Sequence, residues 1–143
     1  MPVKKAVLDT NVLVSALWNP LGTPARIISL MPLGLLIPCY DFRCLKEYRD
    51  VLNRPKFKFS GEKTALLLRE IERYGISITA LPSAVPFTDE ADRKFYETAK
   101  TAGAVLITGN KRHYPNGNLR GKAAPSRFSI ASPSEIAKEW RIG

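Results

Sequence analysis

The chain contains only two cysteines, Cys39 and Cys44, and a single histidine, His113, among its 143 residues. Two cysteines so close in sequence do not make a disulfide framework, and a zinc site built from cysteine and histidine needs more ligands. We therefore expect both thiols to be reduced. No apolar run approaches the roughly 20 residues that cross a bilayer, and no signal-peptide pattern follows Lys4 and Lys5. These absences favour a cytoplasmic protein that does not enter the membrane.

Acidic residues are also few, with 13 aspartates and glutamates against 22 lysines and arginines, for a formal net charge of +9. Such an excess of positive charge attracts polyanions, of which nucleic acid is the commonest. Charge alone does not distinguish RNA from DNA, a membrane surface or an acidic protein. The hydrophobic content of 45% and the length suit a single soluble domain, residues 1–143, with a core of its own.

Apolar runs and helix caps alternate along the chain and predict strands that alternate with helices. The predicted strands are residues 3–8, 35–38, 76–79, 104–108 and 128–131. The predicted helices begin at Thr23, at Asp41, at Glu62, at Thr88 or Asp89, and at a capping box opened by Ser132. This alternation favours an α/β fold, a three-layer α/β/α sandwich with a mostly parallel central sheet. Residues 110–127 show no periodic element, and connections of that length are usually functional or disordered.

Two of the predicted strands end in polar residues. Asp9 follows the first strand, and the sequence Thr108-Gly109-Asn110 follows the strand that begins at residue 104. If these strands are parallel neighbours, their carboxyl ends share the sheet edge where ligands bind in open α/β folds. An ionised aspartate between Leu8 and Val12 is costly to bury unless a cation or hydrogen-bond donors meet it. Asp9 is therefore the first candidate active-site residue.

Two helices can bring further acids to the same edge. Glu47 lies in the helix that Asp41 caps, and Asp92 lies in the first turn of the predicted fourth helix. Converging carboxylates repel one another unless a divalent cation neutralises them, and hard oxygen ligands select Mg²⁺ or Mn²⁺. Such an ion supports phosphodiester cleavage, which suits a basic protein. The alternative, that the helix dipole alone favours these acids, stays open on spacing alone.

Four segments in order resemble the motifs of PIN-domain nucleases: residues 7–13, 47–57, 89–95 and 105–110. The resemblance covers nearly the whole chain and is nearest to the VapC-like toxins of prokaryotic toxin–antitoxin systems. It implies a metal-dependent endoribonuclease in which Asp9, Glu47 and Asp92 bind Mg²⁺ or Mn²⁺, so that metal-activated water hydrolyses RNA. The supporting residues are Thr10, Asn11 and Thr108. The resemblance also implies a homodimer and a small antitoxin protein as partner.

Asn110 departs from the family pattern, because many PIN domains carry aspartate after Thr-Gly. A neutral amide can orient a water or donate a hydrogen bond, but it brings less cation affinity. Some relatives carry asparagine with a following His-aromatic-Pro, as residues 113–115 do here. We therefore interpret Asn110 as a subgroup trait and a candidate catalytic residue, and the number of metals stays open. The alternative is a catalytically degenerate PIN domain that binds RNA without cleaving it.

The candidate RNA contacts lie in two basic segments and are Arg54, Lys56, Lys111, Arg112 and His113. Residues 54–59 interleave cations with phenylalanines, which suits phosphate contact and base stacking. The alternative there is a solvated turn whose phenylalanines pack inward. For His113 we favour a structural or phosphate-contacting role over general-base catalysis. Three further basic residues could extend this surface: Arg120, Lys122 and Arg127.

A phosphatase that forms an aspartyl-phosphate, of the haloacid dehalogenase type, also places aspartate after its first strand. That chemistry normally needs a second aspartate two residues after the first. This chain has Asn11 at that position, so the sequence disfavours this third class of function.

Overall fold

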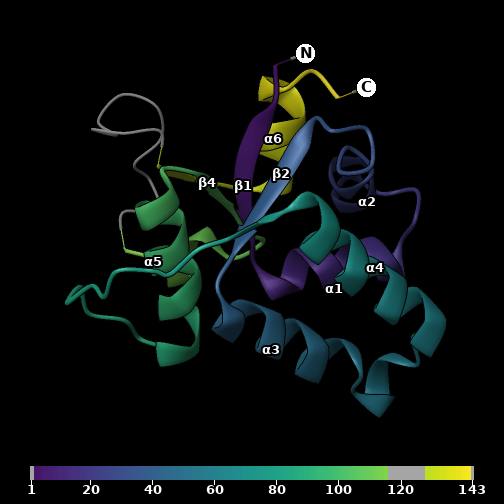
Figure 1. Ribbon diagram of the computed structural model, residues 1–143, viewed down its shortest axis with the longest axis horizontal. Coiled ribbons are helices and arrows are strands. Elements are labelled where there is room, and N and C mark those ends of the chain that lie inside the picture. Colours follow the sequence, from purple (N-terminus) through teal and green to yellow (C-terminus); the bar gives the residue numbers. More distant parts are fainter. Residues whose placement is uncertain (1, 116–127, 143) are drawn as a thin grey trace.

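The computed structural model describes residues 2–115 and 128–142 (Figure 1). Its five strands form one parallel sheet in the order β3-β2-β1-β4-β5. They are β1 (Lys4–Leu8), β2 (Leu36–Tyr40), β3 (Ile76–Ser77), β4 (Val105–Ile107) and β5 (Ser129–Ala131). The three basic residues predicted to extend the RNA surface, Arg120, Lys122 and Arg127, lie outside the described residues.

Helices cover the sheet, and within the described residues they are α1 (Thr10–Trp18), α2 (Thr23–Ile28), α3 (Phe42–Leu52), α4 (Gly61–Tyr74), α5 (Arg93–Ala102) and α6 (Pro133–Glu139). Helix α5 packs against β1, β2 and β4. Helix α2 contacts both α1 and α6. The predicted α/β class with a parallel central sheet is confirmed, and the arrangement agrees with a PIN-like sandwich. No helix in the described part of the chain is both long and apolar enough to span a membrane.

The register of β1 and β4 brings the two polar strand ends together. Val7 pairs with Leu106 and Leu8 with Ile107, and the Asp9 amide donates to the Ile107 carbonyl at 3.0 Å. Strand β2 lies on the other side of β1, so the strand order reverses between β1 and β4. That reversal is where ligands bind in open α/β sheets. The predicted neighbourhood of these two strands is therefore confirmed.

Helix α1 is absent from the sequence prediction, which assigned no element to Thr10–Trp18. Val12 and Val14 are β-branched, and β-branched residues lower helix propensity. Asp9 occupies the N-cap position, but its side chain makes no capping hydrogen bond. The helix is nevertheless stable because Val12 and Leu13 are buried in the core. Tertiary packing outweighs local propensity here.

Several predicted boundaries move by a few residues. Gly22 caps α2 in place of Thr23, α4 starts at Gly61, and the third strand is confined to Ile76–Ser77. The predicted fourth helix divides into a 3₁₀ turn, η2 (Glu90–Asp92), followed by α5. The Asp89 carboxylate accepts a hydrogen bond from the Ala91 amide at 2.9 Å, which tightens this turn. Asp92 consequently stands at the N-cap of α5 rather than within its first turn.

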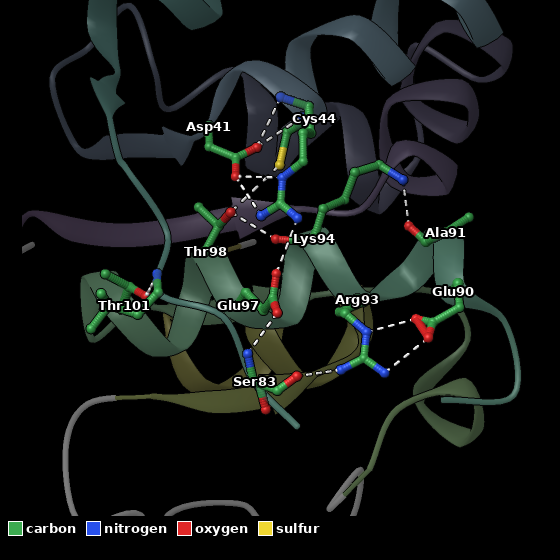
Figure 2. A network of polar contacts seen from close by, with 12 residues as sticks. Asp41, Cys44, Ser83, Glu90, Ala91, Arg93, Lys94, Glu97, Thr98 and Thr101 are labelled. Atoms are coloured by element: carbon green, nitrogen blue, oxygen red, sulfur yellow. Dashed lines mark hydrogen bonds and ion pairs between the residues drawn. The ribbon is translucent and has the colours of Figure 1, made fainter. Parts of the chain in front are cut away.

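A buried ion-pair network ties α3 to α5 (Figure 2). The Arg43 guanidinium binds Asp41 at 2.6 Å and Glu97 at 3.0 Å. Both carboxylates are 4% exposed, and Glu97 also accepts a hydrogen bond from the Ser83 amide at 2.7 Å. Removing one partner from such a group leaves an uncompensated buried charge, so the network resists movement of α3 relative to α5. These are the elements that present Glu47 and Asp92.

Gly75 gives a direct test of the packing between α4 and β2. A Cβ atom at this position would lie 2.3 Å from the Ile71 carbonyl oxygen and 2.4 Å from that of Pro38. Because both obstacles are backbone atoms, we expect Gly75→Ala to lower the free energy of unfolding by about 2 kcal/mol or more. Urea denaturation measures this change.

Gly61→Ala is the matched control, since a Cβ at Gly61 meets nothing within 4 Å. Gly61 begins α4, so we expect its replacement to leave stability unchanged or to raise it by about 0.5–1 kcal/mol. Equal effects of the two substitutions would contradict the close approach at Gly75.

Candidate active site

Asp9 is buried at the carboxyl end of β1, with 6% of its surface exposed. One carboxylate oxygen, Oδ2, accepts two hydrogen bonds, from the Thr108 hydroxyl at 2.9 Å and from the Tyr114 hydroxyl at 2.7 Å. Burial raises the pKa of Asp9, the two hydroxyl donors oppose that effect, and the nearby charge of Glu47 adds to it. The two donors occupy Oδ2, so Oδ1 is the oxygen with capacity for another partner.

Glu47 is half-buried on α3 and has a partner for each oxygen. The Thr10 hydroxyl donates to Oε2, and the Lys94 ammonium lies 2.6 Å from Oε1. The next residue along the helix, Tyr48, is buried and donates its hydroxyl to the Leu8 carbonyl at 2.5 Å. Helix α3 is thereby attached to β1 directly before Asp9, which fixes where Glu47 lies.

Asp92 completes a group of three neighbouring acids. Its Oδ2 atom is buried, and among the described residues no hydrogen-bond donor reaches it. The Nδ1 atom of His113 lies 3.7 Å from Asp92 Oδ2, beyond hydrogen-bond distance. Burial, followed by the charge of Asp9, raises the pKa of Asp92 to about 6, with a smaller contribution from Glu47. A buried oxygen without a donor, facing two other carboxylates, is costly unless a cation meets it.

The predicted supporting residues link α1 to the end of β4. The Asn11 amide group lies 3.5 Å from the Thr108 hydroxyl, and its carbonyl oxygen accepts from the Gly109 amide at 3.0 Å. The Thr108 hydroxyl also accepts from the Asn110 amide at 3.0 Å while it donates to Asp9. Thr10, Asn11 and Thr108 therefore all join the cluster. Asn110 is exposed and contributes its backbone amide to this network.

The donor chemistry of these acids fits a divalent cation. Carboxylate oxygens are the hard ligands that Mg²⁺ and Mn²⁺ prefer, and Asp92 Oδ2 has no hydrogen-bond partner in the described structure. In their present positions these side chains do not form a complete cation site, because the Lys94 ammonium already pairs with Glu47. Within residues 2–115 and 128–142, no three His, Cys, Asp or Glu side chains are grouped closely enough to hold a metal ion.

The predicted RNA contacts fall into two sets. Arg54, Lys56 and Arg112 are exposed, and His113 borders Asp92 with 58% of its side chain exposed. Lys111, by contrast, is engaged in an ion pair with Glu135 at 2.9 Å.

The phenylalanines that follow Arg54 pack against each other. Phe57 and Phe59 are half-buried with their rings stacked 5.3 Å apart, and Trp18 meets both rings edge-on. The Lys56 ammonium lies over the Phe57 ring. This segment therefore keeps its cations at the surface while its rings make contacts within the protein.

Residues 5–112 match the PIN domain, which is about three quarters of the chain. The chain belongs to the PIN-domain family. It is also 33% identical over 141 residues to the uncharacterized protein MJ1680 of Methanocaldococcus jannaschii, a match that covers 95% of this chain and 91% of that protein. Membership of the PIN-domain family indicates a nuclease in general terms.

Two residues of this PIN domain enter the site without having been predicted there. Tyr114 lies in a polar stretch, and only the fold shows that its hydroxyl reaches Asp9 over 105 positions of sequence. Lys94 follows Asp92 by two residues, and its pairing with Glu47 depends on how α5 packs against α3. A buried acid needs donors, which is a signal that some hydroxyl must lie nearby, but the sequence does not say which one.

Tyr114→Phe tests the support of Asp9. The substitution removes one of two hydroxyl donors from a buried carboxylate, and hydrogen bonds to charged groups contribute about 1.5–3 kcal/mol. We expect a loss of that size in the free energy of unfolding at pH 7, measured by urea denaturation. Tyr74→Phe, on the half-buried end of α4, serves as the control and should change stability by less than about 0.5 kcal/mol. If Tyr114→Phe leaves the free energy of unfolding unchanged, buried Asp9 does not depend on this hydrogen bond.

Asp92 gives a pH-dependent prediction for the metal-free protein. Its pKa is about 6 in the folded state against an ordinary 3.8, so the folded state holds a proton that the unfolded chain releases between these values. The contribution of protonated Asp92 to the stability of the folded state is therefore fully present below about pH 4 and is lost as the pH rises through 6. We expect Asp92→Asn to stabilise the protein by about 1–2 kcal/mol at pH 7 and by much less at pH 4.

Urea denaturation in EDTA at the two pH values measures this difference. Asp50→Asn, an exposed carboxylate on α3, is the matched control and should show no such pH dependence. A stabilisation by Asp92→Asn that is equal at both pH values would contradict the raised pKa.

Proposed function

We propose that this PIN domain is a metal-dependent endoribonuclease that hydrolyses RNA phosphodiester bonds. The observation that carries the proposal is the buried Oδ2 atom of Asp92, which has no hydrogen-bond partner in the described residues and interacts electrostatically with Asp9 and Glu47. Asp9, Glu47 and Asp92 would hold Mg²⁺ or Mn²⁺. When bound, such an ion compensates the carboxylate charges, polarises the scissile phosphate and lowers the pKa of water.

The side chains around these acids hold them in place for that chemistry. Thr108 and Tyr114 fix one oxygen of Asp9, and Thr10 orients Glu47 from the first turn of α1. Lys94 lies within contact of Glu47, where it balances part of the negative charge. Asn11 holds the loop after β4 against α1, which keeps Asn110 at the rim of the site.

Positive charge around the cluster supports RNA as the substrate. Arg54, Lys56, Arg112 and His113 are exposed, and we assign them to contacts with the phosphate backbone. Lys111 can join them only by releasing Glu135. The roles as a VapC-like toxin, as a homodimer and as the partner of a small antitoxin rest on the sequence resemblance alone.

A second candidate function is RNA binding without cleavage. The observation in its favour is the pairing of Lys94 with Glu47, together with the neutral Asn110 at the rim. In such a domain the lysine takes the place of the metal as the counter-charge of the cluster. The cleavage assay distinguishes this function from the first.

RNA cleavage with Mn²⁺, Mg²⁺ or EDTA tests the proposed function. We expect cutting of single-stranded or structured RNA with either metal and none with EDTA. Asp9→Asn and Asp92→Asn should each lower the rate about 100-fold or more, since even the outer partners of metal ligands are worth 10- to 100-fold. Glu62→Gln removes the same charge from the exposed surface of α4 and should retain activity. If the protein binds RNA, with or without metal, but cuts none of it, the second candidate function, RNA binding without cleavage, would be established instead.

A further inference from the structure

A groove of about 540 Å³ lies between α3 and the start of α5. Its long wall is formed by α3, with lining residues from Phe42 to Val51, and by Arg54 just after the end of that helix. Its other wall is formed by η2 and the first turn of α5. Glu47 and Lys94 line the groove and also belong to the acidic cluster, so the groove leads directly to that cluster. Its volume lies within the range of about 300–1,000 Å³ that is usual for ligand sites.

Three of the five basic side chains in the groove already have partners in the protein. Arg43 is bound to Asp41 and Glu97, as described above. Arg93 makes a two-point contact with Glu90 and donates to the Ser83 carbonyl (Figure 2). Lys94 is paired with Glu47. These cations stabilise the walls of the groove, and using them to bind a ligand would require breaking those contacts.

The remaining two, Lys46 and Arg54, are exposed and make no hydrogen bond or ion pair in the described part of the chain. Lys46 lies within α3, whereas Arg54 lies just after the C-terminal end of that helix, and both line the same groove. Lys46 precedes Glu47 directly, so one of these cations lies at the acidic cluster and the other lies beyond it. Asp50 lies between them, which leaves positive charge at the two ends of this stretch.

Phe42 lies at the far end of the groove and is 77% exposed at the first position of α3. An exposed ring on a polar groove wall offers a flat surface on which an unpaired base can stack. Bases within a duplex are already stacked on their neighbours, so such a ring favours a single strand.

We propose that one strand of single-stranded RNA lies along α3 in this groove, with phosphates at Lys46 and Arg54 and a base on Phe42. The inference deepens the proposed function and rests on it, because it gives the path by which a strand passes the acidic cluster. It also makes Lys46 a contact residue, although it was absent from the predicted RNA-binding set. The two free cations supply affinity without sequence preference.

Binding can be measured apart from cutting, by fluorescence anisotropy of a fluorescein-labelled oligouridylate in EDTA over a series of salt concentrations. Each phosphate contact on a single strand contributes about 0.7 to the slope of log affinity against log salt. We therefore expect Lys46→Gln/Arg54→Gln to make the slope shallower by about 1.4. Arg69→Gln/Lys138→Gln, at exposed positions of α4 and α6, removes the same net charge outside the groove and should leave the slope unchanged.

Phe42→Ala should weaken binding of the labelled strand about fivefold or more without changing the salt slope, because stacking carries no charge.

The oligouridylate annealed to oligoadenylate should bind more weakly than the single strand. Equal binding of the duplex, or an unchanged slope in Lys46→Gln/Arg54→Gln, would overturn the proposal. If the protein cleaves RNA but the salt slope of Lys46→Gln/Arg54→Gln is unchanged, the nuclease proposal stands and the groove proposal fails. If the slope changes but no RNA is cleaved, the groove proposal stands and the nuclease proposal fails.

Discussion

A carboxylate at the end of a strand buried on both faces needs donors or a cation, and this fold supplies Asp9 with donors from distant parts of the chain. Thr108 follows β4, which lies beside β1 in the sheet, and Tyr114 follows the η3 turn (Lys111–His113). Both bonds require the parallel pairing of β1 with β4, so the geometry of the acidic cluster depends on the register of the sheet. Because burial raises the pKa of Asp9 even with these donors present, the compensation is incomplete. The remaining demand for positive charge is what makes the site suitable for a cation.

The number of positive charges in the chain overstates how many are available to RNA. Arg43 and Arg93 are tied into ion pairs that hold α3, η2 and α5 together, and Lys111 is paired with Glu135. A net charge of +9 favours a polyanionic partner, but it does not indicate which cations would meet that partner. Burial and pairing decide this, and they select a small set of free side chains. Binding surfaces on basic proteins are therefore better defined by unpaired cations than by cation density.

Most of the sheet could be predicted from the sequence because its strands are short apolar runs, and the position of Asp9 at the end of β1 was predicted by the same reasoning. Helix α1 was missed, since its β-branched residues oppose a helix and its stability comes from burial of Val12 and Leu13. Tyr114 and Lys94 were missed for another reason. Their partners lie far away in sequence, and such contacts follow from the packing of whole elements. What the sequence could not supply was therefore the long-range pairing that completes the site.

Tyr48 carries a consequence beyond the site itself. Its hydroxyl is bonded to the Leu8 carbonyl, and its ring stacks on Phe95 at 6.0 Å, three residues after Asp92. The ring pair thus links Glu47 to Asp92, since each ring is close in sequence to one of them, and the Tyr48 hydroxyl links Glu47 to the strand that ends at Asp9. Mutations that change this cluster need not occur at the surface. Natural variation in the interior aromatic pair would alter the spacing between Glu47 and Asp92.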